Sequence, residues 1–142
     1  MASAETKEVF PCSVEQFYSI ITDYEKYHEF LDEVQKCTVV ETKDNKKLVE
    51  FEVKVIKDFT YRIWITEEPD NRIHWVFDSG DLFKVSNGSW DLRDVGGKVE
   101  ASYAVDAKFK VFVPGPIAKT LVKVNLPNMM KNYHSRVAQL FG

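Results

Sequence analysis

The chain has 142 residues, of which 44% are hydrophobic, and its formal net charge is −3. This length fits one domain with a substantial core, and the apolar fraction excludes a natively disordered chain. The slight acidic excess weighs against a nucleic-acid-binding protein, since that class usually carries a clear basic excess.

Localisation is predicted from three features of the sequence. Cys12 and Cys37 are too few for a disulfide-stapled scaffold. No apolar run reaches the roughly 20 residues of a membrane-spanning helix, and residues 1–9 lack the apolar core of a signal peptide. The sequence therefore predicts a cytoplasmic protein, with peripheral contact to a membrane as an open alternative.

The chain is predicted to begin with a strand and a short helix. Residues 4–10 fit a strand that ends at a proline. Ser13 and Gln16 then have the spacing of a capping box, in which each residue bonds the other's backbone N–H. This predicts a helix that runs to about Ile21.

A second short helix is expected directly afterwards. Thr22 and Glu25 repeat the capping-box spacing, which predicts a helix through residues 24–31. Several acidic side chains gather in and after this helix, and they are interpreted as a solvated face: Glu25, Glu29, Asp32 and Glu33.

From residue 36 onward the period changes from helical to alternating, which is typical of half-buried strands. The alternation predicts strands over residues 37–41, 49–55, 61–66, 73–77 and 99–111. Turn residues at 43–46 separate the first of these strands from the second, and turn residues at 69–71 separate the third from the fourth. Short turns between successive strands predict an antiparallel meander.

A further strand is predicted over residues 82–93, with an irregularity inside it. Phe83 and Val85 are odd-numbered, whereas Trp90 is even-numbered, so one regular strand cannot point all three inward. We expect a β-bulge at Asn87-Gly88. The alternative interpretation is an Asn-Gly hairpin, which would split the strand in two.

The last segment, residues 116–141, is predicted to be the one long helical stretch. Apolar residues recur at spacings of three and four: Ile117, Leu121, Val124, Leu126, Met130, Tyr133, Val137 and Leu140. Pro127 interrupts the pattern, so we expect a kink or break near Asn125, with Pro127 in the first turn of a second helix.

These elements predict an α+β fold, with a curved seven-stranded antiparallel sheet, two short helices after the first strand and a long C-terminal helix covering the sheet. Strong curvature opens a gap between sheet and helix, and such a gap is an apolar cavity if side chains do not fill it.

Three segments of the chain carry a resemblance to a known family: residues 11–31, 80–92 and 99–105. The matching positions are Asp23, Tyr24, Tyr27, Phe30-Leu31, Gly88 and Trp90. On these, the chain resembles the START-like (SRPBCC) polyketide cyclase/dehydrase superfamily, whose fold is the helix-grip. The coenzyme-Q-binding branch is the most similar, although His28 stands where that branch usually has proline.

The resemblance implies one START-like ligand-binding domain over residues 1–142 that binds a lipid, quinone or polyketide. The inward-facing positions then become candidate ligand-binding residues: Phe51, Val53, Tyr61, Ile63, Trp75, Phe77, Phe83, Val85, Trp90, Tyr103, Val105, Leu121, Leu126 and Met130. Tyr61 and Tyr103 are the strongest candidates, because a buried phenol needs a hydrogen-bond partner and a ligand oxygen provides one.

The connector before the C-terminal helix is a candidate gate or membrane-contacting lip. Its residues are Phe112, Val113, Pro114, Gly115 and Pro116, and the alternative is a rigid connector. The three isolated histidines do not have metal-ligand spacing. We expect no metal, no cofactor, no nucleic-acid partner and no catalytic residue.

The leading functional hypothesis is non-catalytic binding or carriage of a hydrophobic small molecule, namely a lipid or an isoprenoid quinone. Two alternatives stay open at this stage. One is an aromatase/cyclase-type enzyme acting on a polyketide, and the other is a ribosome-associated interaction module.

Overall fold

The computed structural model describes residues 2–54, 58–110, 112, 114 and 126–142. Its elements follow one another as β1 (Ala2–Phe10), α1 (Val14–Ile21), η1 (Tyr24–Glu29), β2 (Val34–Lys43), β3 (Lys46–Lys54), β4 (Asp58–Glu68), β5 (Arg72–Gly80), β6 (Phe83–Val95), β7 (Lys98–Phe109) and α3 (Leu126–Phe141). The strands form one seven-stranded antiparallel sheet in the order β1-β7-β6-β5-β4-β3-β2.

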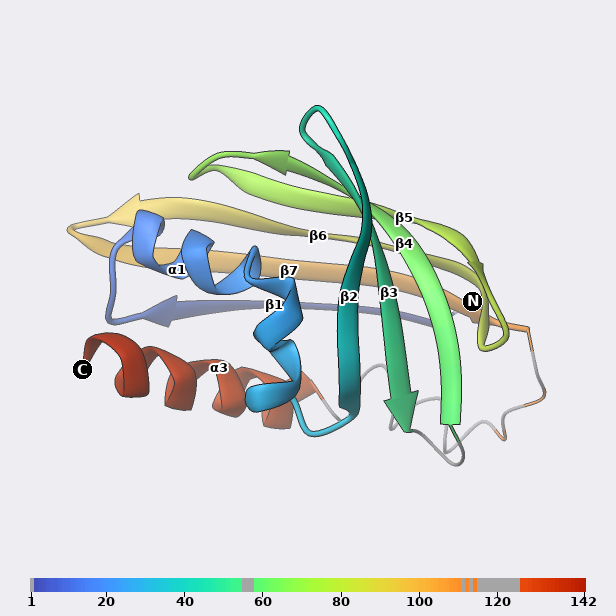
Figure 1. Cartoon of the computed structure of the whole chain (residues 1–142). Helices are drawn as coiled ribbons and strands as arrows, with labels where there is room; N and C mark the ends of the chain where they lie inside the picture. Colours follow the sequence, from blue (N-terminus) through green and yellow to red (C-terminus); the bar gives the residue numbers. More distant parts are fainter. Residues whose placement is uncertain (1, 55–57, 111, 113, 115–125) are drawn as a thin grey trace.

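The predicted fold class is confirmed. The sheet curves around the helices, and α1, η1 and α3 lie on its concave side (Figure 1). The meander from β2 to β7 accounts for six strands, and β1 pairs with β7 to complete the other edge. In the part of the chain that the structure describes, no helix is long and apolar enough to cross a membrane.

The first capping box forms as predicted, and the second does not. Gln16 donates its backbone N–H to Ser13 Oγ at 3.1 Å, and Ser13 donates its own to Gln16 Oε1 at 2.9 Å. Thr22 instead donates its hydroxyl to the Tyr18 carbonyl and closes α1. The second helix, η1, is a short 3-10 helix. Its Glu25 side chain accepts a hydrogen bond from the Val39 N–H on β2, which attaches η1 to the edge of the sheet.

β6 is one continuous strand, which confirms the predicted long strand and rules out the Asn-Gly hairpin. The predicted bulge position was wrong, because the register shift against β7 lies between Phe83 and Val85. Gly88 serves another purpose: a Cβ there would lie 2.4 Å from the ring of Trp75. The glycine therefore leaves space for an indole on the neighbouring strand.

α3 begins at Leu126 with Pro127 in its first turn, where a proline is tolerated because that N–H has no helical partner. This agrees with the prediction of a helix that starts near Asn125. The predicted helical stretch over residues 116–125 lies outside the described residues. The sheet-facing side of α3 buries Met130, Tyr133 and Val137.

Polar contacts fix α3 on both sides. Arg136, which is buried, donates to Glu29 of η1 at 2.9 Å and lies over the Phe30 ring. On the other side, His134 lies 3.2 Å from a Glu8 carboxylate oxygen on β1. The helix is therefore positioned between η1 and the β1 edge of the sheet.

An aromatic cluster fills one end of the space between sheet and helices. The ring of Phe17 from α1 lies 4.5 Å from Phe10, 5.4 Å from Trp90 and 5.9 Å from Tyr133. These four residues, the anchor cluster, come from α1, β1, β6 and α3. Trp90 and Tyr133 of the anchor cluster also border the cavity described below.

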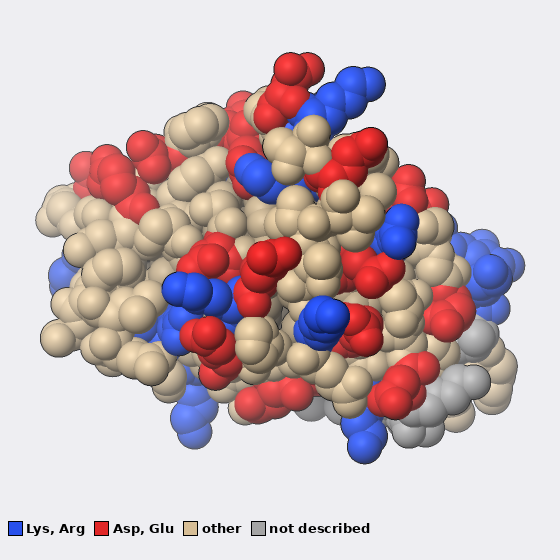
Figure 2. All heavy atoms as spheres, in the orientation of Figure 1, with Lys and Arg blue, Asp and Glu red and all other residues tan. Residues whose placement is uncertain are grey.

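The outer surface is charged and mixed in sign. Figure 2 shows acidic and basic side chains interspersed over one face of the molecule. This distribution is typical of a solvated surface.

The anchor cluster gives a testable stability difference between two adjacent residues. Phe10→Ala should lower the free energy of unfolding by about 3–5 kcal/mol, because the ring is completely buried. Val9→Ala should change it by less than about 0.5 kcal/mol, since this side chain is 47% exposed. Urea unfolding followed by circular dichroism measures both, and equal losses would contradict the assigned core.

Candidate ligand-binding site

A cavity of about 230 Å³ lies between the concave side of the sheet and α3. Ten of the residues that the sequence selected line it: Phe51, Val53, Tyr61, Ile63, Trp75, Phe83, Trp90, Tyr103, Val105 and Leu126. The structure therefore brings most of the selected side chains to one place. Their assignment to ligand binding stays a prediction.

Three selected residues do not line the cavity, and a fourth, Leu121, lies outside the described residues. Val85 is displaced by the register shift beside it, which makes Ser86 the inward residue. Phe77 lies beyond the short pairing of β5 with β6, and its N–H binds the Asn87 side chain instead. Met130 packs in the core, and its neighbour Met129 faces the cavity.

Twelve lining residues were not selected from the sequence: Tyr27, Leu31, Glu33, Val34, Ile65, Ile73, Leu82, Ser86, Ala107, Phe109, Met129 and Tyr133. Some had a usable signal, because Ile65, Ile73, Ala107 and Phe109 continue the inward alternation of the selected strands. Glu33 had none, since it follows η1 in a loop without a period.

Ring contacts fix the walls of the cavity. Tyr61 stacks on Phe51 with centroids 5.2 Å apart and planes 9° apart, and Phe83 meets Tyr61 edge-on at 5.0 Å. Tyr103 is held between two indoles, at 4.9 Å from Trp90 and 5.9 Å from Trp75. Both phenol rings are therefore held in place before any ligand enters.

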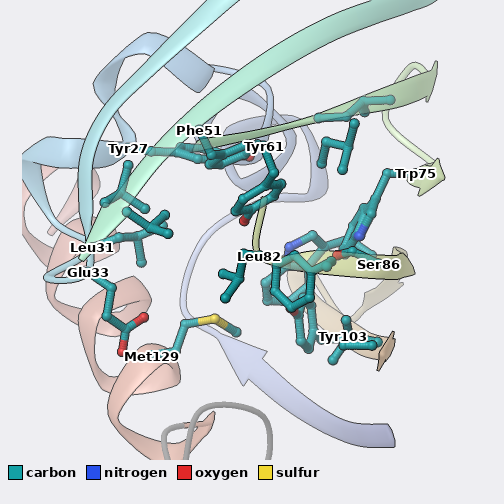
Figure 3. A pocket seen from close by; sticks show the side chains of 18 of the residues that line it. Tyr27, Leu31, Glu33, Phe51, Tyr61, Trp75, Leu82, Ser86, Tyr103 and Met129 are labelled. Carbon is teal, nitrogen blue, oxygen red and sulfur yellow. The ribbon is translucent and has the colours of Figure 1, made fainter. Parts of the chain in front are cut away.

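Three hydroxyl groups face this apolar space. They belong to Tyr61 on β4, Ser86 on β6 and Tyr103 on β7, and Figure 3 shows the Tyr61 hydroxyl pointing into the cavity. None of the three makes a hydrogen bond to a residue within the described ranges. Two other phenols are paired, since Tyr27 donates to the Ile21 carbonyl and Tyr24 donates to a Glu67 carboxylate oxygen, whereas the buried Tyr18 hydroxyl has no partner among the described residues.

Electrostatics keep the two unpaired phenols neutral. Burial raises the pKa of both the Tyr61 and the Tyr103 hydroxyl well above its ordinary value. The negative charge of Glu33 raises both pKa values further. At neutral pH these groups are therefore hydrogen-bond donors that carry no charge.

One end of the cavity is bordered by the loop after η1 and the start of α3. Leu31, Glu33 and Met129 all line the cavity there (Figure 3). Burial, followed by the charge of Asp32, raises the pKa of the Glu33 carboxyl. Glu33 is thus a titratable group that the solvated-face interpretation of the sequence did not anticipate.

The predicted lip is described in part. The Phe112 side chain is 90% exposed, and Pro114 is also exposed. Val113, Gly115 and Pro116 lie outside the described residues. The gating role of this segment stays a prediction.

The comparisons with known proteins agree with this architecture. A family model described as "Polyketide cyclase / dehydrase and lipid transport" matches residues 10–133. The chain belongs to this family. A comparison with curated protein sequences finds no match, and membership of the coenzyme-Q-binding branch stays a prediction.

Several solved structures share the fold of this chain. A START superfamily protein from Mycobacterium smegmatis has a TM-score of 0.86 at 21% identity, over 97% of this chain and 98% of that one. The Zhui aromatase/cyclase from Streptomyces sp. R1128 has a TM-score of 0.84 at 10% identity, over 97% and 94%. A protein from Thermus thermophilus has a TM-score of 0.84 at 18% identity, over 99% and 100%.

The raised tyrosine pKa values predict the behaviour of the protein in alkali. The unfolded chain should ionise its tyrosines near pH 10, whereas the folded chain should keep Tyr61 and Tyr103 protonated there. Their contribution to stability is therefore complete below about pH 10 and is lost as the pH rises further. Tyrosinate absorbance should increase together with loss of the near-ultraviolet circular dichroism. Ionisation of these residues near pH 10 in a folded protein, identified with Tyr61→Phe and Tyr103→Phe, would contradict this.

Proposed function

We propose that this protein binds a hydrophobic small molecule without covalent chemistry and carries it in the cavity between the sheet and α3. The observation that supports the proposal is a largely apolar cavity with stacked aromatic walls whose lining includes three hydroxyl-bearing side chains, Tyr61, Ser86 and Tyr103. Sites for small molecules commonly combine an apolar lining with a few fixed polar groups that orient the ligand.

The cavity volume limits the part of the ligand that is enclosed. An engineered apolar cavity of about 150 Å³ holds one benzene ring, and this cavity measures about 230 Å³. It therefore has room for one or two rings, or for the head of a longer lipid or isoprenoid quinone. A ring system that buries about 200 Å² gains about 5 kcal/mol, which association costs partly offset.

The chemistry of the lining supports binding more than acid–base catalysis. A phenol with a raised pKa is a poor proton acceptor at neutral pH, although it donates hydrogen bonds well. Glu33 is the observation that favours a second candidate, an aromatase/cyclase activity, because a carboxyl with a raised pKa suits a general base. Turnover of a poly-β-ketone that is lost in Glu33→Gln would establish this candidate instead.

The identity of the ligand is tested on protein purified from its own host. Native mass spectrometry should show a fraction of molecules with added mass, and unfolding should release a compound with an apolar ring or chain. Protein that carries no such compound, and that no lipid or quinone stabilises, would refute the carrier function.

A substitution that fills the cavity should abolish binding. Val105→Trp places a large indole in the lining and should weaken the binding of 2-acetylnaphthalene at least about tenfold, since overpacked or occupied space excludes the probe. Val40→Trp is the matched control, because that side chain is exposed on β2 and away from the cavity. Isothermal titration calorimetry and thermal melts separate lost binding from misfolding. Equal affinities of Val105→Trp and the unmodified protein for 2-acetylnaphthalene would place the binding site elsewhere.

The exposed tip after β7 supports the further proposal that this end contacts a membrane surface. Phe112 follows Lys108 and Lys110, which are both exposed. An exposed aromatic beside basic residues suits the interface of an anionic bilayer.

Removing this aromatic side chain should slow ligand transfer. Phe112→Ser should reduce the rate of transfer between anionic vesicles several-fold, because it removes apolar area that enters the interface. Val76→Ser removes an exposed apolar side chain from β5 and should leave the rate unchanged. A fluorescent lipid transfer assay measures both. Identical transfer rates for Phe112→Ser and the unmodified protein would contradict the membrane-contact proposal.

A further inference from the structure

The polar groups around the cavity carry information about the charge of its ligand. Resting on the proposed function, we propose that the cavity selects ligands with an uncharged hydrogen-bond-accepting oxygen, such as a ketone or amide, and discriminates against carboxylates such as fatty acids. The proposal depends on where the three hydroxyls and Glu33 lie.

The hydroxyls favour an acceptor oxygen. Ser86 and Tyr103 lie on neighbouring strands, and Tyr61 reaches the same cavity from β4. Since none of the three bonds to a described residue, each has a proton to donate. A hydrocarbon that enters the cavity would cover these donors without offering them a partner, so a ligand with a carbonyl oxygen gains over it.

The same environment disfavours negative charge on that oxygen. The phenol oxygens of Tyr61 and Tyr103 show what an anionic oxygen would experience there. Burial and the charge of Glu33 raise the pKa of both groups, which means that the phenolate is destabilised relative to the phenol. A ligand carboxylate at this position would be desolvated by the same apolar walls and repelled by the same carboxylate.

The position of Glu33 adds to this discrimination. Its side chain lines the cavity, as does that of Met129 on α3 (Figure 3). The charge of Glu33 already raises the pKa of Tyr61 and Tyr103, so it also disfavours an anion that binds among their hydroxyls. An uncharged ketone or amide is not disfavoured in this way.

Four probes with one ring system separate charge from shape: naphthalene, 2-acetylnaphthalene, 2-naphthamide and 2-naphthoate. Amide and carboxylate are nearly identical in size and differ in charge. Calorimetry at pH 7.5 should show 2-naphthamide binding at least about a hundredfold more tightly than 2-naphthoate. The ketone should bind about three- to tenfold more tightly than naphthalene for each hydroxyl that it engages.

Variants assign the effect to residues. Tyr61→Phe and Tyr103→Phe should each reduce the ratio of ketone affinity to naphthalene affinity, because each removes one donor that only the ketone can engage. Glu33→Gln should lower the ratio of 2-naphthamide affinity to 2-naphthoate affinity several-fold. Asp32→Asn is the matched control, because it removes the same charge one residue away, outside the cavity lining, and should leave the ratio largely unchanged.

The outcomes distinguish this inference from the proposed function. Equal or tighter binding of 2-naphthoate than of 2-naphthamide overturns the charge selection and leaves the carrier function intact. The same ratio in Glu33→Gln and Asp32→Asn overturns the role of Glu33. Failure of all four probes to bind, with thermal melts showing folded protein, counts against the proposed function itself.

Discussion

The anchor cluster is the contact on which the rest of the structure depends. Helices on the concave side of a curved sheet can pack on it only where large side chains from both layers meet. Phe17 supplies that contact from α1 and Tyr133 supplies it from α3, while Phe10 and Trp90 supply it from β1 and β6. Trp90 and Tyr133 of this cluster also line the cavity, so the packed part of the interior borders the space directly.

The cavity requires a compromise between packing and binding. Side chains that closed it would bury more apolar area, and apolar replacements for its hydroxyls would remove unpaired polar groups, so both changes would be expected to stabilise the fold. The chain retains the space and the hydroxyls, and it stabilises the surroundings with stacked and edge-on ring pairs. Such a local departure from optimal packing is typical of functional sites.

The sequence was sufficient wherever side-chain alternation decided the outcome. Inward positions such as Phe51, Ile63 and Tyr103 followed from a period of two, and the capping box at Ser13 followed from local spacing. Features set by contacts between distant segments could not be predicted. The register shift next to Val85 depends on pairing with β7, and the place of Glu33 at the cavity depends on how the loop after η1 meets α3.

The indole of Trp75 lies over Gly88, where no side chain separates it from the backbone, and it forms part of the cavity wall. Trp90 forms another part, whereas Trp64, the third tryptophan of the chain, is not among the lining residues. Two of the three intrinsic fluorophores therefore border the space that a guest would enter. The emission spectrum of the unlabelled protein should thus report occupancy directly, without any added dye.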